Sequence, residues 1–266
     1  MNTDYFLFGL EFEFYLKDEN DKTHFINELN KKLNVKLLDL TSTYYAENPE
    51  EWILSIEKTM PILGNKNGYE LTSPILYFDE LKHTINIVLE ILQEYCFTNE
   101  SCGFHFHISA ESEDLVEPDI IKFLLLLNEN KVFNDYRIRN EFVLNIMDVL
   151  KNTNLDIFKK FYKCLGKYYN VYFVDLDQKH IEIRILGDEN YEYNENISDF
   201  IYSVSKYFYF SMTEDENEKY VILLEEFKKE NSANQTILYK DDLEMLAIKH
   251  ELTFDEMFKK LKEQEY

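Results

Sequence analysis

Ionisable side chains occupy every second position in three short stretches, at residues 9–14, 102–108 and 180–185. Because the side chains of a β-strand alternate between its two faces, each stretch predicts a strand with one polar face. Carboxylates and imidazoles on neighbouring strands suit divalent metal ions, and an arginine among them suits a phosphate group. These stretches therefore predict an active site on one face of a sheet. The polar positions are Glu11, Glu13, His105, His107, His180, Glu182 and Arg184.

The other face of the same strands is apolar. An antiparallel sheet with one face packed on a core gives this alternation. We therefore expect the following residues in the core: Leu10, Phe12, Phe14, Phe104, Phe106, Ile108, Ile181, Ile183 and Ile185.

The rest of the chain supplies further strands and many helices. Strands are predicted over residues 5–16, 35–40, 52–57, 69–77 (interrupted at Pro74), 171–176 and 179–186. Helices are predicted over residues 23–33, 79–96 (with Asp79 as N-cap), 118–133, 139–151, 154–165, 197–210 and 254–261. The fold class is α+β, with an antiparallel sheet and helices on one of its faces. We expect a catalytic domain over residues 1–190, and a helical C-terminal extension over residues 191–266 packed on it.

Composition limits the possible partners. The 266 residues carry 51 Asp plus Glu against 28 Lys plus Arg, a formal charge of −23. Such a charge disfavours binding to nucleic acid and to anionic membranes. The three cysteines lack a Cys-x-x-Cys pair, and no apolar run is long enough to span a bilayer, so we expect a cytoplasmic protein. Expected partners are small-molecule or peptide substrates, and the oligomeric state is left open.

An ordered set of motifs resembles the amidoligase family, the carboxyl–amine ligases that share the glutamine synthetase and glutamate–cysteine ligase fold. The matching pieces cover roughly residues 6–190: Gly-Leu-Glu-Phe-Glu at 9–13, Trp52 with Glu57, Glu-Leu-Thr-Ser-Pro at 70–74, Cys-Gly-Phe-His-Phe-His at 102–107 and Glu-Ile-Arg at 182–184. There is one departure. The family usually has an aspartate followed by a small hydroxylated residue where this chain has Glu57-Lys58-Thr59.

The resemblance implies an ATP-dependent ligase that forms an amide through an acyl phosphate on an amino acid, peptide or small metabolite. ATP and Mg²⁺, or Mn²⁺, would be its cofactors. Arg184 and Glu57 are then the catalytic candidates, and Arg184 and His107 the nucleotide-binding ones. One histidine of the His105/His107 pair would bind metal, and we assign His105. The implied metal ligands are Glu11, Glu13, Glu70, His105 and Glu182.

Two other functions stay open. His105, His107 and an acidic residue could hold Zn²⁺ in a metal-dependent hydrolase. Alternatively, the chain could be a non-catalytic binding or structural descendant of the ligase fold, in a phage or mobile element. The departure at Glu57 and the helical tail favour this last reading. The sequence contains neither a P-loop nor a Gly-x-Gly-x-x-Gly motif. Gly103 indicates a close backbone approach, which makes Cys102 a structural residue rather than a nucleophile.

Overall fold

The structure is a computed structural model that describes residues 3–41, 50–129, 145–153, 155–162, 169–175, 178–187 and 189–231. The helix predicted over residues 254–261 lies outside this part of the chain. So do parts of the helices predicted over residues 118–133, 139–151 and 154–165.

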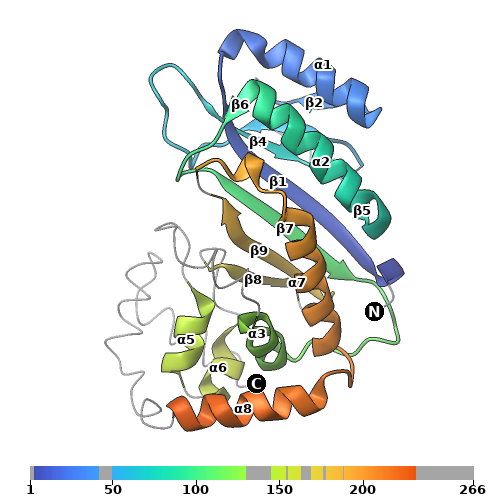
Figure 1. The fold of residues 1–266 in the computed structure, drawn as a ribbon, viewed down its shortest axis with the longest axis vertical. Coiled ribbons are helices and arrows are strands. Elements are labelled where there is room, and N and C mark those ends of the chain that lie inside the picture. The colour runs from blue at the N-terminus through green and yellow to red at the C-terminus, as the bar shows by residue number, and fades with distance from the viewer. Residues whose placement is uncertain are drawn as a thin grey trace.

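The described residues contain one mixed, mostly antiparallel sheet of nine strands (Figure 1). Its order is β2-β3-β4-β1-β7-β9-β8, while β5 and β6 pair with the two ends of β1. Among the strands of the described residues, only β2 and β3 run parallel, so the sheet is not wholly antiparallel as predicted. The strands are β1 (Phe6–Leu16), β2 (Leu38–Asp39), β3 (Ile53–Ile56), β4 (Gly68–Thr72), β5 (Leu76–Tyr77), β6 (Cys96–Phe97), β7 (Gly103–Ala110), β8 (Val171–Asp175) and β9 (His180–Gly187).

Helices pack against this sheet and complete an α+β fold, as predicted. They are α1 (Lys22–Leu33), α2 (Phe78–Tyr95), α3 (Ile120–Asn128), α5 (Ile146–Asn152), α6 (Leu155–Phe161), α7 (Ile197–Ser211) and α8 (Asn217–Asn231). Short 3₁₀ helices cover Thr3–Tyr5, Glu19–Asp21 and Tyr191–Tyr193. No helix among the described residues is long and apolar enough to cross a membrane.

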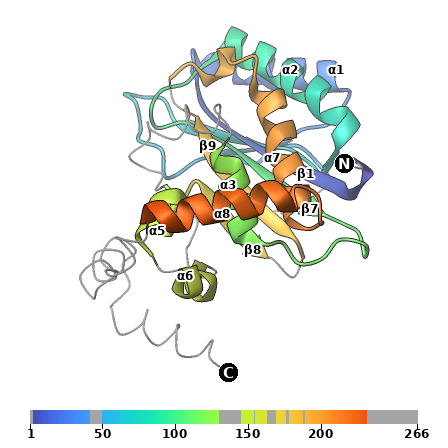
Figure 2. The same cartoon turned by 60° about the horizontal axis from the view of Figure 1, so that its bottom comes forward.

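The apolar face of the sheet is packed under helices, which lie together on one side in Figures 1 and 2. Alternate residues of β1 are fully buried because they point into this layer. Aromatic contacts show which helix covers which strand. Phe25 of α1 contacts Phe14, Phe78 of α2 contacts Phe8, and Phe200 of α7 contacts Phe106 at a centroid distance of 6.0 Å. The core therefore leaves the opposite face of the central strands for polar side chains.

The C-terminal helices are tied to the rest of the core by a buried lysine. Phe208 of α7 contacts Phe123 of α3. Lys122 of α3, which is 2% exposed, donates to the backbone oxygens of Thr213 and Asp215 and to Asn217 Oδ1. These three bonds hold the α7–α8 turn against α3 and satisfy the ammonium group. The division into residues 1–190 and 191–266 stays a prediction.

Several predicted boundaries differ in detail. The strand predicted over residues 35–40 is reduced to Leu38–Asp39. The N-cap of α2 is Tyr77 and not Asp79, because the Glu80 side chain accepts from the Tyr77 N–H in a capping-box arrangement. Asp119 caps α3, whose first residue is Ile120, so Pro118 lies just outside the helix. The helix α8 was not singled out from the sequence.

Candidate active site

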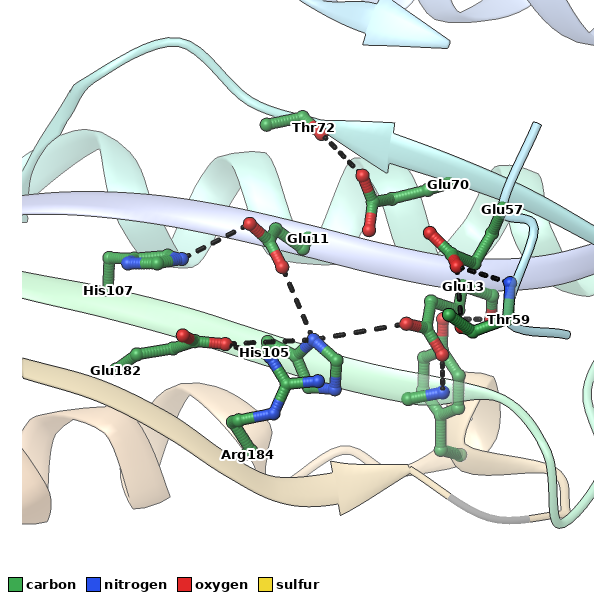
Figure 3. A network of polar contacts seen from close by, with 12 residues as sticks. Glu11, Glu13, Glu57, Thr59, Glu70, Thr72, His105, His107, Glu182 and Arg184 are labelled. Carbon is green, nitrogen blue, oxygen red and sulfur yellow. Dashed lines mark hydrogen bonds and ion pairs between the residues drawn. The ribbon is translucent and has the colours of Figure 1, made fainter. Parts of the chain in front are cut away.

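Strand pairing brings the polar side chains of β1, β4, β7 and β9 together on one sheet face (Figure 3). Glu13 of β1 is the register partner of Glu70 on β4, which in turn pairs with Ser55 on β3. Glu11 pairs with Thr72 on one side and His105 on the other. Directly paired residues of antiparallel strands share a face. Residues far apart in sequence therefore meet here, as the alternation of β1 and β7 predicted.

Three carboxylates form what we call the acidic group: Glu13, Glu57 and Glu70. One oxygen from each lies within 4.8 Å of the others, a spacing that could hold a metal ion. Thr59 donates to Glu57 Oε1 through its backbone N–H, at 2.7 Å, and its hydroxyl. Burial, together with the charges of Glu11, Glu57 and Glu13, raises the pKa of Glu70 to about 8. Burial also raises the pKa of Glu13, although the nearby His105 opposes the rise.

Glu11, His107 and Glu182 form a second group, the mixed group, whose ligand atoms also lie within 4.8 Å of one another. His107 Nε2 is 3.1 Å from Glu11 Oε1. Burial disfavours ionisation of Glu11, but hydrogen bonds and charge attraction from His105 and His107 outweigh it. The pKa of Glu11 therefore lies well below its usual range. The pKa of His107 is raised, because its contact with Glu11 outweighs the effect of burial.

His105 lies between the two groups and is 5% exposed. Its Nδ1 is 3.2 Å from Glu11 Oε2, and 4.0 Å from both Glu13 Oε1 and Glu182 Oε1. Gly103 makes this position possible, because a Cβ there would overlap His105 Nε2 and lie 3.0 Å from Glu13 Oε2. The Gly103 N–H also donates to Glu13 Oε2 at 2.6 Å. The close backbone approach expected at Gly103 is confirmed.

Arg184 reaches the site from an irregular part of β9. Phe104 pairs with Leu186 but Phe106 pairs with Ile183, so β9 has one extra residue opposite His105. The predicted alternation therefore fails at this point, and Leu186, not Ile185, lies opposite Phe104. Arg184 Nη1 donates to Glu182 Oε1, whereas its buried Nε has no hydrogen-bond partner. The guanidinium consequently keeps a donor available beside the mixed group (Figure 3).

The family described as "Putative amidoligase enzyme" matches residues 6–138, which is half of the chain. The chain belongs to this amidoligase family. No curated protein matches it. The matched range of the amidoligase contains the whole acidic group, together with Glu11, His105 and His107. Glu182 and Arg184 lie beyond that range and join the site through the pairing of β9 with β7.

All eight site residues predicted for this amidoligase lie in one connected cluster (Figure 3). Their grouping differs from the expected one. Glu57, predicted as catalytic, lies with Glu13 and Glu70, whereas Glu11 lies with His107 and Glu182. The Glu57-Lys58-Thr59 departure still gives the acid a hydroxyl donor, because the Thr59 side chain hydrogen-bonds to the Glu57 carboxylate from two residues away. The roles assigned to these residues stay predictions.

Sequence reasoning left one polar residue of this face without a role. His180 Nε2 lies 3.0 Å from His107 Nδ1. Burial, followed by the charge of His107, lowers the pKa of His180. Its position two residues before Glu182, on the same predicted strand face, could have indicated that it lies in the site.

Cys102 is unsuited to nucleophilic chemistry, as expected. It is fully buried, and burial raises the pKa of its thiol to about 12. Trp52 lies in the core at 3% exposure.

Proposed function

We propose that this amidoligase is an ATP-dependent carboxylate–amine ligase, using Mg²⁺ or Mn²⁺, that forms an amide on an amino acid, peptide or small metabolite. The observation that carries the proposal is the pair of neighbouring ligand groups beside Arg184 on one sheet face. We further propose that the sheet corresponds to the glutamine synthetase and glutamate–cysteine ligase fold, in which nucleotide binding depends on the sheet and its metal ions.

The charge of the cluster supports metal binding. Five carboxylates, from Glu11, Glu13, Glu57, Glu70 and Glu182, stand against the guanidinium of Arg184. Such a face would repel a bare polyphosphate. Carboxylate oxygens are the ligands that Mg²⁺ prefers, and Mn²⁺ also accepts imidazole. Burial raises the pKa of Glu70, and the charges of Glu11, Glu57 and Glu13 raise it further. The donor set therefore fits two divalent ions.

The residues can be assigned as follows. Glu13, Glu57 and Glu70 would hold one ion, and Glu11, His107 and Glu182 the second. Bound there, the ions would neutralise phosphate charge and orient the polyphosphate. His105 would keep Glu11 and Glu13 in place between the two groups, through its contacts of 3.2 and 4.0 Å. This assignment gives His107, and not His105, the metal contact.

Arg184 is suited to the transferring phosphoryl group. Its planar guanidinium is fixed by Glu182 on one side and keeps its Nε without a partner. In the proposed reaction, a substrate carboxylate oxygen attacks the γ-phosphorus of ATP and ADP leaves. The amine nitrogen then attacks the acyl carbon, phosphate leaves, and the nitrogen loses a proton. Arg184 would stabilise the charge that spreads over the phosphoryl oxygens in the first step.

The test is ADP release from Mg-ATP in the presence of pooled carboxylates and amines, such as amino acids and polyamines. We expect ADP to form only when both substrate types are present, and an amide product to accumulate with it. Glu13→Gln should abolish release. Glu90→Gln is the control, because Glu90 lies on the exposed side of α2 and pairs with Lys32 at the surface.

Each alternative gives a different result in this assay. Bond cleavage without ATP, in a protein that contains zinc, would indicate the hydrolase. Absence of ADP release with every substrate pool would contradict the ligase and favour a non-catalytic descendant of the fold.

A further inference from the structure

His180, like His105, is a histidine of the polar face that belongs to neither ligand group, and it lies against His107. It begins β9, where its register partner is Ser109, and one residue pair, Ile181 with Ile108, separates it from Glu182 and His107. Its Nε2 is 3.0 Å from His107 Nδ1, and the two rings are 5.2 Å apart at an interplanar angle of 53°. The contact is therefore directed from one ring nitrogen to another and is not a stack.

His107 uses its two nitrogens on opposite sides. Its Nε2 faces Glu11 Oε1 at 3.1 Å, within the mixed group, and its Nδ1 faces His180. A neutral imidazole can bind a metal only through the nitrogen without a proton. The partner of the other nitrogen decides which one that is, and it also fixes the plane of the ring.

We infer that His180 is a positioning residue for His107: it accepts the Nδ1–H bond and so keeps the His107 Nε2 lone pair directed at the metal position between Glu11 and Glu182. This inference rests on the proposed metal role of His107. The reverse hydrogen bond, donated by His180, would leave the proton on His107 Nε2. His107 would then only donate to Glu11, and changes at His180 would not affect metal binding.

Manganese binding tests the inference without ATP or substrates. Mn²⁺ affinity is measured by the loss of the free-ion electron paramagnetic resonance signal, and nitrogen coupling to the bound ion by pulsed measurements. The variants are His180→Leu, which removes the acceptor, and His180→Gln, whose side-chain oxygen can replace it. His83→Leu is the control, because His83 is exposed on α2, which covers the opposite face of the sheet. Thermal unfolding in the presence of a chelator shows whether each variant is folded.

We expect His180→Leu to weaken Mn²⁺ binding about tenfold or more and to reduce the nitrogen coupling. His180→Gln should recover most of the affinity, and His83→Leu should leave it unchanged. Unchanged affinity in His180→Leu, or equal losses in the Leu and Gln variants, would overturn the positioning role and leave the proposed ligase activity untouched.

The wild-type protein gives a measurement that does not depend on the folding of any variant. Nitrogen coupling from a directly bound imidazole is expected there. Bound Mn²⁺ that shows no nitrogen coupling would overturn the inference but would still support metal binding by the carboxylates. No Mn²⁺ binding at all would overturn both the inference and the proposed metal-dependent function.

Discussion

The acidic group and the mixed group lie side by side on one sheet face, yet the pKa values of Glu70 in the first and Glu11 in the second are shifted in opposite directions. In the acidic group, Glu70 is surrounded by other carboxylates, and its pKa is raised to about 8. In the mixed group, ring nitrogens of His105 and His107 lie 3.2 and 3.1 Å from the two carboxylate oxygens of Glu11, and the pKa of Glu11 is depressed. The same residue type at similar depth thus has opposite properties, because of the neighbours that strand pairing supplies.

This difference shows how each group depends on a cation. The mixed group has a partial counter-charge in its own His107 and in the adjoining Arg184. The acidic group has hydroxyl and backbone donors, from Thr59, Thr72 and Gly103, and its Glu13 carboxylate lies 4.0 Å from His105 Nδ1. We therefore expect the acidic group to gain more from a bound metal ion.

The largest expected effect concerns Arg184, whose partner Glu182 belongs to the mixed group. Replacement by Lys should reduce the rate of ADP formation at saturating ATP by about 100-fold, nearly as much as replacement by Ala. Lysine keeps the charge but loses the planar fork that contacts two phosphoryl oxygens at once. Turnover of Arg184→Lys close to that of the wild type would place Arg184 outside the phosphate site.

Gly103 is the point at which both groups can be disturbed together. Gly103→Ala should lower the free energy of unfolding by about 1–3 kcal/mol, because the new methyl group must displace the His105 ring and the Glu13 carboxylate. Chemical unfolding measures the loss. Gly9→Ala, on the same face, is the control, since its Cβ would meet His107 Cβ at an ordinary 3.5 Å. Equal stability of the two variants would contradict the crowding at His105.

Removing one charge from each group should change stability in opposite directions. In metal-free protein at pH 8.5, Glu11→Gln should destabilise the fold by about 1–3 kcal/mol, because two histidines lose a charged acceptor. Glu70→Gln should stabilise it by on the order of 1 kcal/mol, because repulsion within the acidic group is relieved. Both variants should bind Mn²⁺ more weakly. If denaturant titrations show that both variants change the free energy of unfolding in the same direction, the distinction between the groups is wrong.

The polar face could be predicted because it follows from a single local rule, the alternation of side chains along a strand. Glu11 and Glu13, and likewise His105 and His107, are two residues apart, and β1 and β7 are regular where they lie. The core residues of these strands could be predicted for the same reason, since Phe104 and Phe106 take the alternate positions and are buried.

The grouping of the ligands could not be predicted in this way. Glu57 joins Glu13 and Glu70 because β3, β4 and β1 pair in a particular register, which a local pattern does not contain. The bulge in β9 is likewise invisible in the alternating residues 180–185, because it depends on which residue of β7 lies opposite. The contact between His107 and His180 needs the pairing of β7 with β9 and two specific ring orientations.

A further expected effect needs no mutation, only a change of pH in metal-free protein. The folded-state pKa of Glu70, about 8, exceeds its unfolded value, so the folded chain holds a proton that the unfolded chain releases. The free energy of unfolding should therefore fall as pH rises from about 5 to about 8. The raised pKa values of Glu13 and His107 act in the same direction. Glu11 acts only at lower pH, where protonation would remove its stabilising contacts.

Urea unfolding at pH 5.5 and pH 8 measures this dependence, once with a chelator and once with Mg²⁺. Bound Mg²⁺ should flatten it, because the ions replace the protons on the acidic group. Glu70→Gln should remove much of the slope without metal, whereas Glu90→Gln should keep it, because Glu90 is at the surface. Metal-free stability that rises from pH 5.5 to pH 8 would contradict the raised pKa of Glu70 and would mean that the acidic group is not held under repulsion.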